Sequence, residues 1–162
     1  MILAPRDVEP VDVLLVCSTG GHLLELCALE DAWGSLDRLW ITFDRPDAHA
    51  VLGSERVLFA HGPTNRSVKN LVRNMVLAWR VLRRARPSAL VSTGAGVAVP
   101  FAWLARARGV RVVFVESLTR IEGPSLSGRL VAPFADRLYV QWPELSRSMR
   151  GSRFVGNIFS DR

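Results

Sequence analysis

Cysteine is scarce in this sequence of 162 residues, which contains only Cys17 and Cys27. Two such cysteines supply neither the ligand set of a zinc site nor the framework of a small disulfide-rich domain. Long hydrophobic runs are lacking too, because no apolar stretch reaches the roughly 20 residues that a membrane-spanning helix requires. The N-terminal segment is charged, so neither a signal peptide nor a membrane anchor is expected. These absences favour a cytoplasmic chain.

Lysine is nearly absent, because the sequence contains one lysine, Lys69, and twenty arginines. The formal net charge is +6. A basic balance suits nucleic acid, an anionic membrane surface or a phosphorylated ligand, and net charge alone does not separate these partners. The sequence has no recognised nucleic-acid-binding motif, and its basic tract contains few aromatic residues. We therefore expect no nucleic-acid partner.

Short apolar runs alternate with segments of helical periodicity along the whole chain. The runs predict strands at residues 11–17, 38–43, 56–60, 89–92, 111–115 and 137–140, and the periodic segments predict helices at 23–33, 66–86, 97–108 and 126–134. This alternation predicts an α/β fold with a parallel sheet and helices on both faces. No repeat or linker divides the sequence, so residues 1–162 are expected to form a single domain.

Two short glycine loops, Ser18-Thr19-Gly20-Gly21-His22 and Ser92-Thr93-Gly94-Ala95-Gly96, each follow a predicted strand and precede a predicted helix. Small residues let backbone amides approach an anion, and the helix that follows directs its positive end to the same place. The carboxyl ends of parallel strands lie at one edge of a sheet, so both loops should meet at one crevice. A tight strand-to-helix turn needs the same small residues, and neither loop is a dinucleotide fingerprint. Phosphate binding and a plain turn both remain open from the spacing alone.

Two side chains near these loops are candidates for acid–base chemistry. His22 stands at the start of the first predicted helix, and its ordinary pKa suits proton transfer near neutrality. It could equally serve as a solvent-facing cap. Glu116 directly follows the strand at 111–115, where it could act as an acid or base, or hold the loop through an ion pair with a residue such as Arg120.

The segment at 66–86 is basic and amphipathic. Its basic residues and tryptophan are Lys69, Arg73, Trp79, Arg80 and Arg84, and an apolar stripe comprises Val68, Leu71, Val72, Met75, Trp79 and Leu82. Such a helix is typical of binding to a membrane surface. A helix that covers the sheet and exposes a charged outer face fits the same pattern.

Five motifs, in this order, carry a resemblance to a known family. They are Ser18-Thr19-Gly20-Gly21-His22, Ser92-Thr93-Gly94-Ala95-Gly96 with Pro100, Val115-Glu116-Ser117-Leu118-Thr119-Arg120, Ser125-Leu126-Ser127-Gly128 and Gln141-Trp142-Pro143-Glu144-Leu145. From Val13 to Phe159 the sequence resembles the acceptor-side subunit of split GT-B glycosyltransferases. This is the family of the membrane-anchoring subunit of the UDP-N-acetylglucosamine transferase of asparagine-linked glycosylation, with bacterial exopolysaccharide-biosynthesis counterparts.

The resemblance implies a half enzyme. This chain would be the Rossmann-like N-terminal lobe that binds a polyprenyl-diphosphate-linked sugar, and a separate partner subunit would bind the nucleotide-sugar donor. His22 would lie near the acceptor hydroxyl as its base, with Glu116 as the second candidate for that role. The residues expected at the acceptor's diphosphate are Ser18, Thr19, Gly20, Gly21, Gly94, Ala95, Gly96 and Arg120. The scheme needs no cofactor and no metal.

Eukaryotic members of this family carry an N-terminal membrane helix that this sequence lacks. We therefore expect peripheral attachment to the anionic inner face of the cell membrane through the segment at 66–86. An alternative is a scaffold that recruits a partner glycosyltransferase to the membrane without doing chemistry. A free-standing nucleotide-sugar enzyme such as an epimerase would need a nucleotide-binding half, for which 162 residues leave no room.

Overall fold

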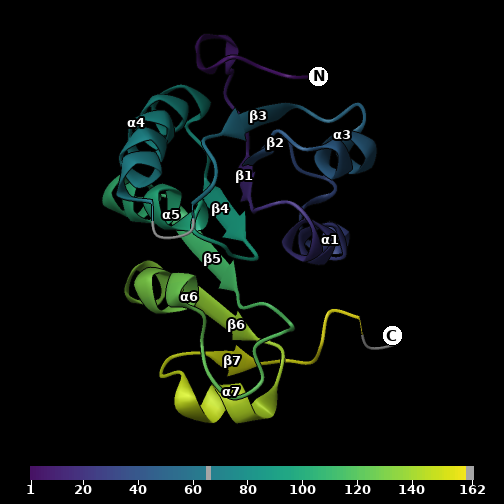
Figure 1. Cartoon of the computed structure of the whole chain (residues 1–162), viewed down its shortest axis with the longest axis vertical. Coiled ribbons are helices and arrows are strands. Elements are labelled where there is room, and N and C mark those ends of the chain that lie inside the picture. Colours follow the sequence, from purple (N-terminus) through teal and green to yellow (C-terminus); the bar gives the residue numbers. More distant parts are fainter. Residues whose placement is uncertain (65–66, 160–162) are drawn as a thin grey trace.

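The computed structural model describes residues 1–64 and 67–159. Within these residues seven strands form one sheet in the order β3-β2-β1-β4-β5-β6-β7, and each neighbouring pair is parallel (Figure 1). The strands are β1 (Val13–Val16), β2 (Arg38–Phe43), β3 (Val57–Ala60), β4 (Ala89–Ser92), β5 (Arg111–Val115), β6 (Arg137–Val140) and β7 (Arg153–Phe154). The strand order reverses between β1 and β4, and ligand crevices in such sheets form beyond the carboxyl ends of the strands at this point.

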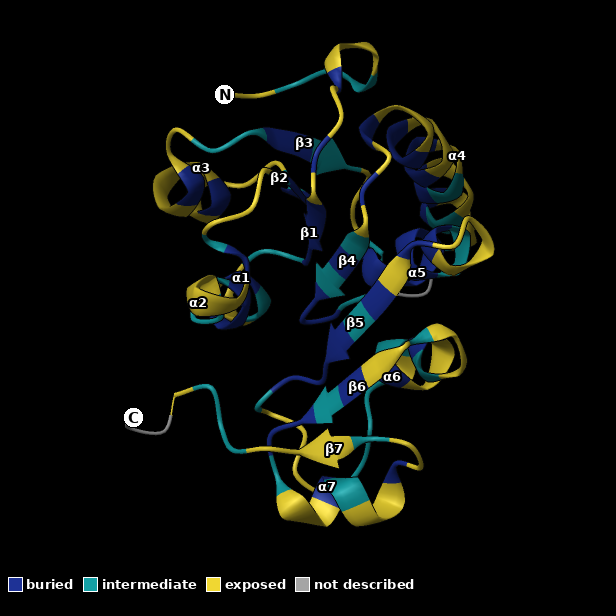
Figure 2. Cartoon of the chain, turned by 180° about the vertical axis from the view of Figure 1, so that it is seen from behind, coloured by how far each residue is buried: buried dark blue, intermediate teal, exposed yellow. Residues whose placement is uncertain are grey.

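Helices cover both faces of the sheet (Figure 1, Figure 2). One face carries α4 (Val68–Ala85), α5 (Ala98–Ala107) and α6 (Leu126–Val131), and the other carries α1 (Gly21–Cys27), α2 (Glu30–Trp33) and α3 (Pro46–Leu52). The chain also forms α7 (Pro143–Ser148) after β6 and two short 3-10 helices, η1 (Pro5–Asp7) and η2 (Ala132–Phe134). The predicted α/β fold with a parallel sheet and helices on both faces is confirmed.

Some local predictions differ from the structure. The bounds of β2, β4, β5 and β6 are those predicted, but the helix predicted at 23–33 is wrong, because α1 and α2 are separate helices. Sequence reasoning missed α3 and α7, which are too short to show a clear helical period and which each have proline in the first turn. The predicted start of α4 at Arg66 lies outside the described residues.

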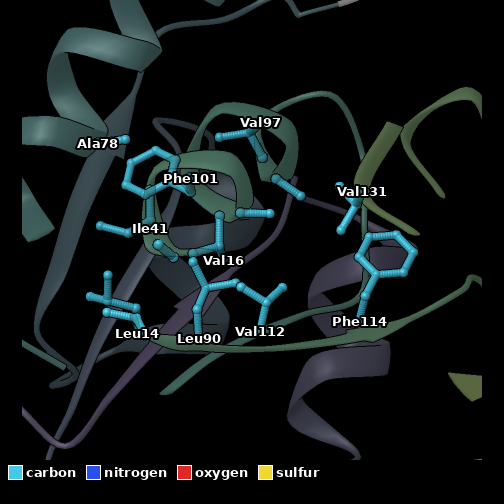
Figure 3. Close-up of a cluster of buried hydrophobic side chains, with 14 of the residues drawn as sticks. Leu14, Val16, Ile41, Ala78, Leu90, Val97, Phe101, Val112, Phe114 and Val131 are labelled. Atoms are coloured by element: carbon cyan, nitrogen blue, oxygen red, sulfur yellow. The ribbon is translucent and has the colours of Figure 1, made fainter. Parts of the chain in front are cut away.

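Alternate residues of the strands build two hydrophobic clusters, one on each face of the sheet. The larger cluster includes Leu14 and Val16 of β1 together with Phe101 of α5 (Figure 3). The smaller cluster takes Val13 and Leu15 from the same strand and packs them against α1, α2 and α3. Because β1 is buried on both faces, its sequence is a continuous apolar run rather than an alternating one.

Helix α4 packs through a face that its sequence pattern indicates only in part. Asn70 and Asn74 point inward, where the side chain of Asn74 bonds both the amide and the carbonyl of His61 and Asn70 donates to the carbonyl of Pro63. These amides satisfy the backbone of the loop that precedes the helix. The apolar stripe predicted from the sequence therefore overlaps the packing face only in part, since Leu82 is buried in the larger cluster but Val68, Val72 and Trp79 are exposed. Four exposed members of this helix are apolar: Val68, Val72, Val76 and Trp79.

Candidate active site

A crevice in two lobes lies beyond the carboxyl ends of the central strands. The first lobe, of about 550 Å³, is lined by residues that follow β1, β2 and β3, and the second, of about 420 Å³, by residues that follow β4 and β5 and begin α6. His22, Thr64 and Ala95 line both lobes. The structure thus brings together the two glycine loops and the loop after β5, as their places at the strand ends predicted.

His22 is held at the junction of the lobes by the loop after β4. Its Nδ1 lies 2.9 Å from the carbonyl oxygen of Thr93, and the hydroxyl of Thr93 donates to the carbonyl of His22 at 2.6 Å. A carbonyl oxygen only accepts hydrogen bonds, so this contact requires the proton on Nδ1. In the neutral ring, Nε2 is then the nitrogen that accepts a proton.

Gly94 makes room for the ring of His22. Its φ is +117°, and a Cβ at this position would lie 3.3 Å from Cε1 of His22. The amide of Gly94 donates to the side chain of Ser92 at 3.0 Å. Glycine at this position therefore permits a close approach by the imidazole and a backbone conformation that other residues rarely adopt.

The first glycine loop has an acidic neighbour that sequence reasoning missed. The amide of Gly20 donates to Oδ2 of Asp47, the second residue of α3, at 2.7 Å. Ser18 and Thr19 line the first lobe, whereas Gly20 and Gly21 are exposed and do not belong to its described lining. One of the backbone amides that were predicted to bind phosphate thus donates its hydrogen bond to a carboxylate of the chain.

Glu116 is completely buried beneath the loop that it begins. Its Oε1 accepts from the amide of Ser117 at 3.1 Å, and its Oε2 accepts from the amide and the hydroxyl of Ser125 at 3.0 Å each. Ser125 in turn caps α6. A Cβ at Gly128 would overlap Oε2, so the glycine gives the carboxylate its space. These bonds hold the loop in place, and the catalytic role of Glu116 stays a prediction.

Other predicted residues of the second glycine loop and the loop after β5 line the second lobe. Ala95 and Gly96 form one wall, and Ser117, Thr119 and the exposed Arg120 form another. Directly after Gly96 and Val97 the ten-residue helix α5 begins, so its positive end adjoins the crevice. This lobe therefore combines hydroxyl groups, a guanidinium and a helix N-terminus.

Glu25 is a second residue near His22 that the sequence analysis did not identify. It is 4% exposed, and its Oε1 accepts from the hydroxyl of Ser117 at 2.9 Å and the amide of Leu118 at 3.0 Å. Its Oε2 lies 3.9 Å from Nδ1 of His22 and has no hydrogen-bond partner among the described residues. Burial raises the pKa of this carboxyl. The spacing of three residues from His22 on one helix is the signal that could have found it.

The exposed side of α4 forms a separate basic and apolar surface. The predicted residues Lys69, Arg73, Trp79, Arg80 and Arg84 are all exposed on it. A groove of about 500 Å³ runs between η1 and the second half of this helix, where the Arg83 guanidinium lies 4.8 Å from the centre of the Trp79 ring. Within residues 1–64 and 67–159, none of the helices combines the length and apolar character that crossing a bilayer demands.

Comparison with known proteins identifies the family. Residues 56–158 match the family described as "Oligosaccharide biosynthesis protein Alg14 like". The UDP-N-acetylglucosamine transferase subunit ALG14 of Eremothecium gossypii is 41% identical, across 91% of this chain and 80% of that protein. The chain belongs to the Alg14 family. The Homo sapiens ALG14 subunit is 24% identical to this Alg14-family chain, across 98% of the chain and 89% of the human protein.

Solved structures show that this Alg14-family chain has a GT-B-like Rossmann fold. MurG of Acinetobacter baumannii superposes with a TM-score of 0.72 at 14% identity, covering 90% of this chain and 45% of MurG. UDP-N-acetylglucosamine 2-epimerase of Rickettsia bellii superposes with a TM-score of 0.67 at 12% identity, covering 93% of this chain and 46% of the epimerase. The chain thus spans less than half of either protein.

Proposed function

We propose that this chain is the acceptor-side subunit of a two-component glycosyltransferase of polysaccharide biosynthesis. The complex transfers a sugar from a nucleotide-sugar donor to a polyprenyl-diphosphate-linked sugar. The observation that carries the proposal is the arrangement of His22, whose Nδ1 is bonded to the Thr93 carbonyl at the junction of both crevice lobes. Membership in a family of glycosyltransferase subunits supports it.

In the proposed reaction His22 acts as the general base. The acceptor hydroxyl is a poor nucleophile at neutral pH, so its attack on the donor's anomeric carbon benefits from proton removal. The new bond forms between the hydroxyl oxygen and that carbon while the bond from the carbon to the nucleoside diphosphate breaks, and the proton moves to Nε2. A positioned base of this kind contributes roughly 10²–10⁴-fold.

The acceptor's diphosphate is assigned to the polar walls of the crevice. Ala95 and Gly96 precede the positive end of α5, Arg120 supplies a guanidinium, and Ser18 and Thr19 supply hydroxyl groups. Binding through the loop at 20–21 would require the Asp47 carboxylate to leave the amide of Gly20. The second lobe is therefore the preferred place for the diphosphate, and Gly94 contributes by admitting the His22 ring. Ser18 and Thr19 line only the first lobe, so they would contact the part of the diphosphate that extends past His22.

We propose that residues 1–162 form one domain and that the donor binds to a partner subunit. The chain matches 45% of MurG, and the Eremothecium gossypii relative is named as a subunit of a transferase, which supports a two-component arrangement. An apolar groove of about 470 Å³ lies beside α2 and is lined by Val91, Val113 and Val115 of the sheet and by Ile158 of the C-terminal segment. We assign this groove to an apolar segment of the partner subunit, since α1, α2 and α3 leave this part of the sheet open.

Reconstitution tests this assignment. A mixture of this chain with a copurifying protein that carries a nucleotide-sugar lobe is expected to transfer labelled N-acetylglucosamine from UDP-N-acetylglucosamine to a polyprenyl-diphosphate-linked acceptor. Neither protein alone should do so, because each supplies one wall of the reaction site. Val113→Glu places a charge in the groove and should weaken partner binding in a pull-down, whereas Val155→Glu, at an exposed position of the lining, should weaken it less. Full transfer, or tight uridine-diphosphate binding, by the isolated chain would contradict the proposal.

We further propose that the exposed side of α4 attaches the protein peripherally to the inner face of the cell membrane. Val68, Val72, Val76 and Trp79 are exposed beside basic residues, which suits the interface of an anionic leaflet. Each basic residue near such a surface contributes about 1 kcal/mol.

Vesicle sedimentation measures this attachment. The double variant Lys69→Ala, Arg80→Ala is expected to bind anionic vesicles about thirtyfold more weakly, which corresponds to a loss of about 2 kcal/mol. The control Arg147→Ala, Arg150→Ala removes the same charge at exposed positions in and after α7 and should bind like the unaltered chain. Binding that ignores anionic lipid and salt would refute the attachment through α4.

A further inference from the structure

We propose that Glu25 is a positioning residue for His22, and that its carboxylate stabilises the imidazolium formed when Nε2 accepts a proton from the acceptor. The inference rests on the proposed function of the crevice. Glu25 lies outside both glycine loops and is a different residue from Glu116, the acidic residue that follows β5.

The contacts of Glu25 hold its carboxylate next to the ring of His22. Its Oε1 is held by the Ser117 hydroxyl and the Leu118 amide, at 2.9 and 3.0 Å, so the carboxylate has a defined orientation. Its Oε2 is buried, has no hydrogen-bond partner among the described residues, and lies 3.9 Å from Nδ1 of His22. A buried carboxylate oxygen without a partner is costly, and a positive charge on the neighbouring ring would compensate it.

Thr93 and Glu25 both lie near Nδ1 of His22, but they have different roles. The carbonyl of Thr93 accepts the Nδ1 proton and so sets the tautomer, and this contact exists whether the ring is neutral or charged. The Glu25 carboxylate stabilises the charged ring far more than the neutral one. It therefore favours the protonated state of His22 that the proposed reaction produces, without contacting substrate itself.

Other charged groups face the same region and are unchanged in the test variants. Glu116 lies close enough to Glu25 to raise the pKa of the Glu25 carboxyl, although burial raises that pKa more. Arg120 lines the second lobe, Asp44 and Arg45 line the first, and Asp47 bonds the loop before His22. Their effect on the His22 ring is common to each protein compared, so a difference between variants reports Glu25.

An NMR titration of the histidine ring protons tests the inference without measuring activity. The chain has three histidines, and the His22→Gln variant assigns the resonance of His22. Glu25→Gln keeps an oxygen for Ser117 and Leu118 but removes the charge, so the ring of His22 should lose its proton at a lower pH than in the unaltered chain. Glu30→Gln removes an equal charge from an exposed position on α2 and should leave the titration of His22 unchanged.

The dispersion of the amide proton resonances in the same spectra shows whether each variant is folded. If Glu25→Gln does not fold, Glu25→Asp retains the charge but withdraws it from the ring and should also shift the titration of His22 to lower pH. An unchanged titration of His22 in the folded variant overturns the inference.

Turnover by the reconstituted complex separates this inference from the function on which it rests. Glu25→Gln should lower kcat about tenfold with little change in KM, and Glu25→Asp should recover part of the loss. If His22→Ala is slow but Glu25→Gln has normal turnover, the role of Glu25 is wrong and the proposed function stands. If His22→Ala also turns over normally, the proposed function fails, even where the NMR coupling is present.

Discussion

Replacing His22 with alanine in the complex with its partner subunit is expected to lower kcat about a hundredfold, within the range for loss of a general base. The ring nitrogen Nε2 is the proposed proton acceptor, because the Thr93 carbonyl at 2.9 Å holds the proton on Nδ1. Alanine removes the base but leaves the start of α1 and the hydrogen bond from the Thr93 hydroxyl to the backbone of residue 22. KM should change less than kcat, because the diphosphate is bound by other groups.

The matched control for this experiment is His61→Ala. His61 is exposed, and its backbone groups are bonded by Asn74 whatever its side chain. Its loss should leave turnover unaltered. A His22→Ala complex that forms normally and turns over at the original rate would favour the scaffold alternative and reduce His22 to a residue that shapes the loop.

Replacing Phe101 with alanine is expected to lower the free energy of unfolding by about 3–5 kcal/mol. The ring of Phe101 is fully buried in the larger hydrophobic cluster, where α5 packs on the sheet (Figure 3). Its removal loses apolar burial and leaves a cavity that the neighbouring strands fill only in part. Such a loss is a large share of the roughly 5–15 kcal/mol that stabilises a typical domain.

Urea denaturation of the isolated chain measures this change. Phe154→Ala is the matched control, because Phe154 of β7 is 43% exposed and should cost less than about 1 kcal/mol. A loss below 1 kcal/mol in Phe101→Ala would show that α5 does not pack as described. The two variants carry the same chemical change, so their difference reports burial alone.

The strands could be predicted from the sequence because a strand buried on both faces is a short apolar run with clear ends. Arg38–Phe43 and Arg111–Val115 have the predicted bounds for this reason. Helices were less predictable where they are short or where polar side chains face the interior. In α4, Asn70 and Asn74 face inward to bond the preceding loop, and a hydrophobicity pattern assigns such residues to the surface.

The candidate site too could be predicted from the sequence only in part. The positions of the two glycine loops at strand ends predicted that they would share a crevice, and both loops do line it. The pattern could not show that Gly20 donates to Asp47, or that Gly94 lies against the His22 ring. Glycine is needed for several reasons, and the residue type does not distinguish between them.

Periodicity and strand-end motifs along the chain were therefore enough to establish the class of fold, its parallel sheet and the edge where a site should lie. The sequence patterns that predict those features involve neighbours within a few residues. Folding in three dimensions was needed to settle the tautomer of His22, the burial of Glu116 and the place of Glu25. The sequence does show that Glu25 follows His22 by three residues on one helix. The hydrogen-bond partners Thr93 of His22 and Ser117 of Glu25 are 71 and 92 residues away in the chain, and spacing along one helix or loop carries no information about contacts at that separation.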